Sequence, residues 1–115
     1  MRDWTAIRER YLRDELPIRL GGLAANLARI TSFSSHAASL EVVESLLDES
    51  KFFIEWTAMD ADTDTAAELI ELQLQLARWQ GSCTSIWKDP AQRLELGKQA
   101  HLWSERVLDR SGLLR

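Results

Sequence analysis

The chain is poor in the residues that break helices and that cross-link small secreted proteins. Its 115 residues include five glycines, two prolines and one cysteine. So few glycines and prolines argue against an all-β sandwich or barrel, which needs many tight turns. The lone cysteine, Cys83, cannot form an intrachain disulfide, which is typical of a protein from a reducing cytoplasm. We expect it to be a small buried hydrophobic residue.

Long uncharged hydrophobic runs are also missing. No stretch approaches the roughly 20 apolar residues that span a bilayer, and the N-terminal sequence MRDWTAIRER holds no apolar core of signal-peptide length. We therefore expect a cytoplasmic protein without a transmembrane helix. Hydrophobic residues nevertheless make up 45% of the chain. This fraction excludes an intrinsically disordered protein and suffices for one core in a single domain, 1–115.

Basic residues are scarce in the middle of the chain. Residues 36–71 carry ten acidic groups and one lysine, Lys51, whereas the segments on either side are mildly basic, within a net charge of −4. This balance disfavours nucleic acid as a ligand. The acidic segment either packs between two basic helices or offers a surface, including Glu44, Asp48 and Glu55, that attracts a basic protein partner.

Hydrophobic residues recur at helical spacing along the chain. The spacing predicts helices over about 4–15, 17–34, 38–58, 64–80 with an extension to 88 left open, and 90–110. Capping residues and prolines mark their ends: Asp3, Pro17, Thr65 with Glu68 as a capping box, Asp89 with Pro90, and Gly112. Helices of this length joined by short loops predict an all-α fold, an up-and-down antiparallel four-helix bundle with an additional N-terminal helix.

Tryptophan is over-represented among the aromatic residues and is spread along the predicted helices, at Trp4, Trp56, Trp79, Trp87 and Trp103. We interpret the tryptophans as large core anchors that pack against a face of small residues on the second helix. That face comprises Gly21, Gly22, Ala24, Ala25 and Ala28. A buried indole N–H needs an acceptor, and Gln73 and Gln80 are the expected partners.

The helix predicted from residue 64 has two hydrophobic stripes. The first comprises Leu69, Leu72, Leu76, Trp79 and Cys83, and the second comprises Ala66, Ile70, Leu74 and Ala77. Gln73 and Gln80 lie between the stripes. In one interpretation, the first stripe faces the core and the second faces another subunit. In the other, the two glutamines line a small-molecule pocket together with His101. We favour the interface, and with it a homodimer.

Acidic residues in one twelve-residue window have the ligand spacing of a calcium-binding EF-hand loop: Asp60, Asp62, Asp64, Glu68 and Glu71. Thr65 stands where the sharp turn of that loop needs glycine. A helix cap explains the same residues without a metal, so we predict no metal site here. His36 and His101 likewise give no sequence support for a metal or haem site, and we expect His101 to be a hydrogen-bonded core residue.

Arg29 is followed by His36 with six residues between them. The pair resembles the RNA-cleaving motif of HEPN-domain nucleases, which are small helical bundles. The resemblance implies that Arg29 would stabilise the strained phosphate and that His36 would assist catalysis. The motif here falls between the second and third predicted helices rather than late in the chain. A solvated loop histidine is the alternative interpretation.

The runs LGGLAANLARI (20–30) and KFFIEWTA (51–58) resemble those of short, all-helical, uncharacterised proteins from cyanobacteria. The resemblance extends over most of the chain and implies no activity. The residues themselves favour a protein-interaction or scaffold module without catalysis or a cofactor. The alternatives are a HEPN-like ribonuclease, a bundle that binds a small ligand such as a tetrapyrrole, and a weak calcium site. The residues expected to matter are Ile70, Gln73, Leu74, Gln80, Glu44, Asp48 and Glu55.

Overall fold

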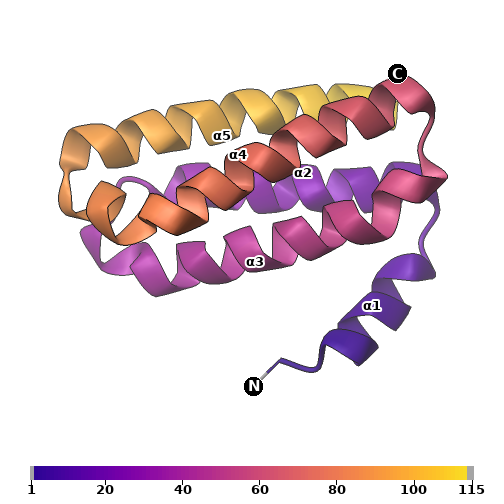
Figure 1. Cartoon of the computed structure of the whole chain (residues 1–115), viewed down its shortest axis with the longest axis horizontal. Coiled ribbons are helices and arrows are strands. Elements are labelled where there is room, and N and C mark those ends of the chain that lie inside the picture. Colours follow the sequence, from indigo (N-terminus) through magenta and orange to yellow (C-terminus); the bar gives the residue numbers. More distant parts are fainter. Residues whose placement is uncertain (1, 114–115) are drawn as a thin grey trace.

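Five α-helices and two short 3-10 helices form the computed structural model, which describes residues 2–113. They are α1 (Trp4–Leu12), α2 (Leu16–Phe33), η1 (Ala37–Ser39), α3 (Leu40–Thr57), η2 (Ala58–Asp60), α4 (Thr63–Lys88) and α5 (Pro90–Ser111). Each of α3 to α5 runs opposite to the helix before it, and α1 lies obliquely on the outer side of α3 (Figure 1). α2 contacts α3, α3 contacts α4, α4 contacts α5, and α5 closes the ring on α2. In the described part of the chain, no helix is long and apolar enough to cross a membrane.

Most helix ends follow the capping signals in the sequence. Asp3 accepts a hydrogen bond from the amide of Ala6 at 3.1 Å, and Asp89 accepts one from the amide of Ala91 at 2.9 Å. Pro17 lies in the first turn of α2, where its missing N–H leaves no bond unmade. Gly112 ends α5 with φ +74°, a left-handed conformation that favours glycine.

One predicted helix end and one predicted helix cap are wrong. α1 ends at Leu12 rather than residue 15, because the chain must turn before the Pro17 of α2. The capping box at Thr65 does not cap α4: the helix begins at Thr63, and the carboxylate of Asp62 accepts from the Thr65 amide at 3.4 Å. α4 also runs on past Gly81 to Lys88, because tertiary burial of its first stripe offsets the weak helix formers there.

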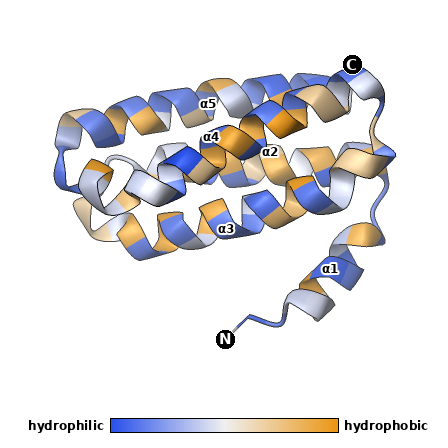
Figure 2. Ribbon diagram, viewed as in Figure 1, coloured by the Kyte–Doolittle hydropathy of each residue, from blue (hydrophilic) through white to orange (hydrophobic). Residues whose placement is uncertain are grey.

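The core is built from one hydrophobic stripe of each of the helices α2 to α5. Its leucine and isoleucine members on α2 and α4 are almost wholly buried: Leu20, Leu23, Leu27, Ile30, Leu69, Leu72 and Leu76. Figure 2 shows hydrophobic and hydrophilic residues alternating along each helix, as expected for helices that turn one face inward. The inward stripe predicted for α4 is therefore confirmed as core.

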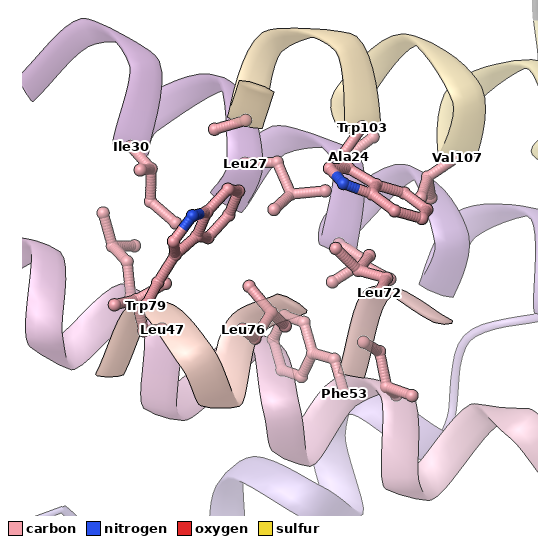
Figure 3. Close-up of a cluster of buried hydrophobic side chains, with 14 of the residues drawn as sticks. Ala24, Leu27, Ile30, Leu47, Phe53, Leu72, Leu76, Trp79, Trp103 and Val107 are labelled. Atoms are coloured by element: carbon pink, nitrogen blue, oxygen red, sulfur yellow. The ribbon is translucent and has the colours of Figure 1, made fainter. Parts of the chain in front are cut away.

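Three of the tryptophans are core anchors, as predicted. Trp79, Trp87 and Trp103 are buried, and in Figure 3 the indoles of Trp79 and Trp103 lie on either side of Leu27 of α2. The prediction that Gln73 and Gln80 accept hydrogen bonds from the indoles is wrong. The indole of Trp87 donates to the backbone carbonyl of His36 at 3.2 Å, and neither Gln73 nor Gln80 accepts from a tryptophan within residues 2–113.

The most extensive helix contact joins α2 and α5, and it depends on small residues. A Cβ atom placed on Gly97 of α5 would lie 2.7 Å from the Cβ of Ser34. Side-chain hydroxyls of each helix bond to backbone carbonyls of the other. The hydroxyl of Thr31 donates to the Gly97 carbonyl at 2.9 Å, and that of Ser104 donates to the Ala24 carbonyl at 2.8 Å. Of the small residues predicted to receive the tryptophans, Ala24 is buried at this contact with α5, whereas Ala25 and Ala28 are exposed.

An aromatic cluster holds α1 against α3. The ring centroids of Trp4 and Phe52 are 4.4 Å apart. Those of Tyr11 and Phe53 are 4.0 Å apart, and the two rings stack with an interplanar angle of 9°. Trp56 contacts both α1 rings, Trp4 edge-on and Tyr11 at a tilt of 54°. The prediction that Trp4 and Trp56 are core anchors against α2 is therefore wrong: they pack α1 onto the outside of α3.

Replacing Gly97 with alanine should destabilise the protein. The new methyl group would overlap Ser34, whose Cβ is held by the backbone of α2, so the two helices must separate. We expect a loss of about 1–3 kcal/mol in the free energy of unfolding, measured by urea denaturation.

Gly81→Ala is the matched control, because a Cβ on Gly81 would meet nothing within 4 Å. There the same substitution in a helix interior should stabilise the chain by roughly 0.5–1 kcal/mol. Equal effects at both positions would contradict a close α2–α5 contact at Gly97.

Candidate functional site

A row of apolar and small residues runs along the solvent side of α4. We call it the outer row: Ala67, Ile70, Leu74, Ala77 and Gly81, all exposed. Ile70 is 57% exposed and Leu74 is 56% exposed. The residues follow one another in steps of three and four, which keeps them on one face of the helix. The second stripe predicted for this helix is therefore at the surface, apart from Ala66, which is half-buried.

Of the two glutamines beside the outer row, Gln80 lies at the contact between α4 and α3. The Lys51 ammonium donates to Oε1 of Gln80 at 2.8 Å, and Nε2 of Gln80 donates to Asp48 at 2.8 Å. Gln73 is half-buried, and its Oε1 has no hydrogen-bond partner in the described structure. Since Gln80 is engaged by α3 through both of its polar atoms, it forms part of the helix contact.

The acidic residues singled out on α3 form an edge along the same side of the molecule. Glu44, Asp48 and Glu55 are exposed and lie four and seven residues apart, which places them on one face of the helix. Because Asp48 reaches Gln80, that face borders α4. The structure thus brings all seven predicted residues to the neighbouring faces of α3 and α4. We call Glu44, Asp48 and Glu55 the acidic edge.

The opposite edge of α4 is tied to α5 by ion pairs. Glu68 accepts from Arg106 at 2.7 Å and from Arg110 at 2.6 Å, and Arg106 also lies 3.4 Å from Glu71. Partial burial by itself would raise the pKa of Glu68, but the bonds and charges of Arg110 and Arg106 lower it overall. Glu68, Arg106 and Arg110 line an open polar hollow of about 400 Å³. Since Glu68 already engages both arginines, we assign them to holding α4 and α5 together.

The acidic residues of the EF-hand-like window contact different groups. Asp60 pairs with Arg19 at 3.0 Å, Asp62 caps α4, and Glu68 pairs with the arginines of α5. From Thr63 onward the window is helix rather than loop. Within residues 2–113, no three histidine, cysteine, aspartate or glutamate side chains group closely enough to hold a metal ion.

The histidines and Arg29 lie at the surface. Arg29 is exposed on α2, and His36 is exposed at the start of η1. In the described chain, no hydrogen bond or ion pair joins their side chains. His101 is also exposed and lies 3.0 Å from the carboxylate of Glu105. The expectation that His101 belongs to the core is therefore wrong: its position on α5 turns it to solvent.

The sequence did not predict a buried polar cluster that lies between α1 and the helices α2 and α3. Arg19 is 8% exposed and donates to Asp60 at 3.0 Å and to the carbonyl of Trp56 at 3.5 Å. The Tyr11 hydroxyl donates to the Arg19 carbonyl at 2.7 Å and accepts from Thr57 at 3.2 Å. In the sequence, this polar cluster is signalled only by Arg19, which precedes the core residue Leu20 of α2. These bonds tie α1, α2 and the end of α3 together.

Cys83 is buried in the first stripe of α4, as predicted. Burial raises the pKa of its thiol to about 11, and the negative charge of Glu44 acts in the same direction. The reactive thiolate is therefore almost absent at neutral pH, which fits a packing role.

No protein-family model matches this chain, and no curated protein or solved structure matches it either.

The single tyrosine allows a direct test of α1 docking. Burial raises the pKa of Tyr11 from 10.0 to about 12. Since the folded state favours the neutral phenol, its contribution to stability is fully present below pH 10 and is lost as the pH rises toward 12. Phenolate absorbance should titrate near 12 in the folded protein and near 10 in urea.

Ile7→Ala is the control for this titration, because Ile7 packs α1 onto the core without contributing a charge. Weaker docking should lower the pKa of Tyr11 toward its ordinary value. A pKa near 10 in the folded wild-type protein would contradict the buried position of this side chain.

Proposed function

We propose that this chain is a protein-interaction module that binds a helix through the outer row of α4. Its framework is an up-and-down antiparallel four-helix bundle, α2 to α5, with α1 as an additional N-terminal helix, acting in the cytoplasm without a resident cofactor. The exposure of Ile70 and Leu74 on one face carries the proposal. No contact inside the described chain needs these side chains there.

Burial of the outer row would favour association. Ile70 and Leu74 each leave more than half of the side chain exposed, and covering them is worth about 1 kcal/mol apiece. The alanines and the glycine of the row are small enough to let a helix backbone come close. The three-and-four spacing is the pattern with which one helix packs against another. These features together support a helix as the bound element.

Polar groups border the outer row on both sides, as in protein interfaces with an apolar centre and a polar rim. The acidic edge of α3 lies on one side, and the ion-paired groups Glu68 and Arg106 lie on the other. The rim supplies charge for orienting a partner, whereas the apolar row supplies the contact area.

A photo-cross-linking amino acid at position 74 tests the proposal in cells that produce the full chain. If the outer row is an interface, Leu74 faces another polypeptide, and irradiation should give a discrete cross-linked species of higher mass. Denaturing electrophoresis followed by mass spectrometry identifies the linked polypeptide and the residues joined.

Ile18 is the matched control position. It is an isoleucine of similar exposure, 50%, on α2, which lies across the bundle from α4 in the ring of contacts. The cross-linker placed there should give no discrete species. The same pattern from both positions, or no product from position 74, would show that the outer row is not an interface.

A further inference from the structure

We infer that the helix bound by the outer row is α4 of a second copy of this chain, packed antiparallel about a twofold axis that passes between Gln75 and Leu76. The inference rests on the proposed function and specifies its partner. It follows from the order of large and small residues along the row, from an unexplained glycine and from the charges beside it.

The outer row is complementary to itself when one copy is reversed. A twofold axis between residues 75 and 76 sets Ile70 of one copy against Gly81 of the other, and Leu74 against Ala77. Ala67 then faces Thr84, which is also exposed. A larger side chain thus meets a smaller one in each layer, over about 25 Å of helix. This is also the register in which the two kinds of seam position alternate across an antiparallel coiled coil.

Gly81 supports the same antiparallel pairing independently. It lies inside α4, its φ is not positive, and a Cβ there would meet nothing within 4 Å. Glycine destabilises a helix relative to alanine at such a position. The single chain therefore offers no packing or conformational reason for it, whereas the close approach of Ile70 from a second copy requires a residue without a side chain.

Charges beside the row agree with the same register. Glu71 and Arg78 are exposed, and each follows a residue of the row, so both lie on the flank toward α5. Antiparallel pairing brings this flank of one copy against the same flank of the other. Glu71 then faces Arg78 of the second copy, and the twofold axis repeats the pair. In the described chain Arg78 has no ion pair, and Glu71 meets Arg106 at 3.4 Å.

A parallel pair fits less well. It would set Ile70 against Ile70 and Gly81 against Gly81, so that the layers alternate between crowded and empty. Glu71 and Arg78 would no longer face each other. The antiparallel pair does bring the acidic edges of both copies to the same side, and their repulsion limits the affinity without changing the register.

Sedimentation equilibrium on the purified full chain tests the partner. The wild-type chain should reach the mass of two chains between micromolar and millimolar concentration. Leu74→Asp should weaken association by roughly 100-fold or more, because two carboxylates would enter the contact. Ile18→Asp is the matched control and should associate as the wild type does. Circular dichroism should show unchanged helix content in both variants.

Gly81→Leu separates association from folding. The leucine should raise the stability of the single chain, because its site is open and leucine is a good helix former. The same side chain would occupy the space of Ile70 from the second copy, so the dimer should weaken by about tenfold or more. Unchanged association of Gly81→Leu would overturn the proposed register.

Engineered cysteines test the orientation, in a background in which Cys83 is replaced by alanine. Ile70→Cys chains mixed with Gly81→Cys chains should form disulfide-linked dimers on mild oxidation. Neither variant should link to itself, because the antiparallel register separates equivalent positions by about 16 Å along the helix, beyond the reach of a disulfide. Self-linked dimers of either variant, without mixed ones, would overturn the antiparallel arrangement.

These results also separate this inference from the proposed function. A wild-type chain that keeps the mass of one chain up to millimolar concentration would overturn the inference. Cross-links from position 74 to a different polypeptide would then still support an interaction module. Absence of any cross-link from position 74, together with a single-chain mass, would overturn both.

Discussion

The close contact between α2 and α5 is the constraint on which the rest of the structure depends. Gly97 leaves room for Ser34, and the hydroxyls of Thr31 and Ser104 bond to backbone carbonyls across the gap. This contact closes the ring of helices, in which α4 packs between α3 and α5. The outer row of α4 faces solvent because the first stripe of the same helix is held inward by that closed ring.

Polar contacts join one edge of α4 to α3 and the other edge to α5, and the outer row lies between these two edges. Lys51 and Asp48 engage Gln80 on the α3 side, while Arg106 and Arg110 engage Glu68 on the α5 side. Such exposed contacts contribute little stability individually. Together they orient α4 about its own axis, which determines that Ile70 and Leu74 point outward.

Helical periodicity predicted the elements and much of the core, because burial of one face repeats every three to four residues whatever the partner is. It also predicted that Ile70 and Leu74 would stand outside the core. It did not predict the partners of polar groups. Gln80 bonds to Asp48 and Lys51 rather than to an indole, and His101 lies in solvent, because such contacts depend on the rotation of neighbouring helices.

The sequence by itself determined the all-helical class, the approximate helix limits and the two stripes of α4, since these follow from local propensity, capping and spacing. Tertiary structure decided that Asp62 rather than Thr65 caps α4, that Gln80 bonds to α3, and why Gly97 is glycine. It also showed that Gly81 has no such reason within the chain. The two glycines look alike in sequence because a glycine carries no side chain from which its neighbours can be inferred. Only the distance to the facing helix distinguishes them.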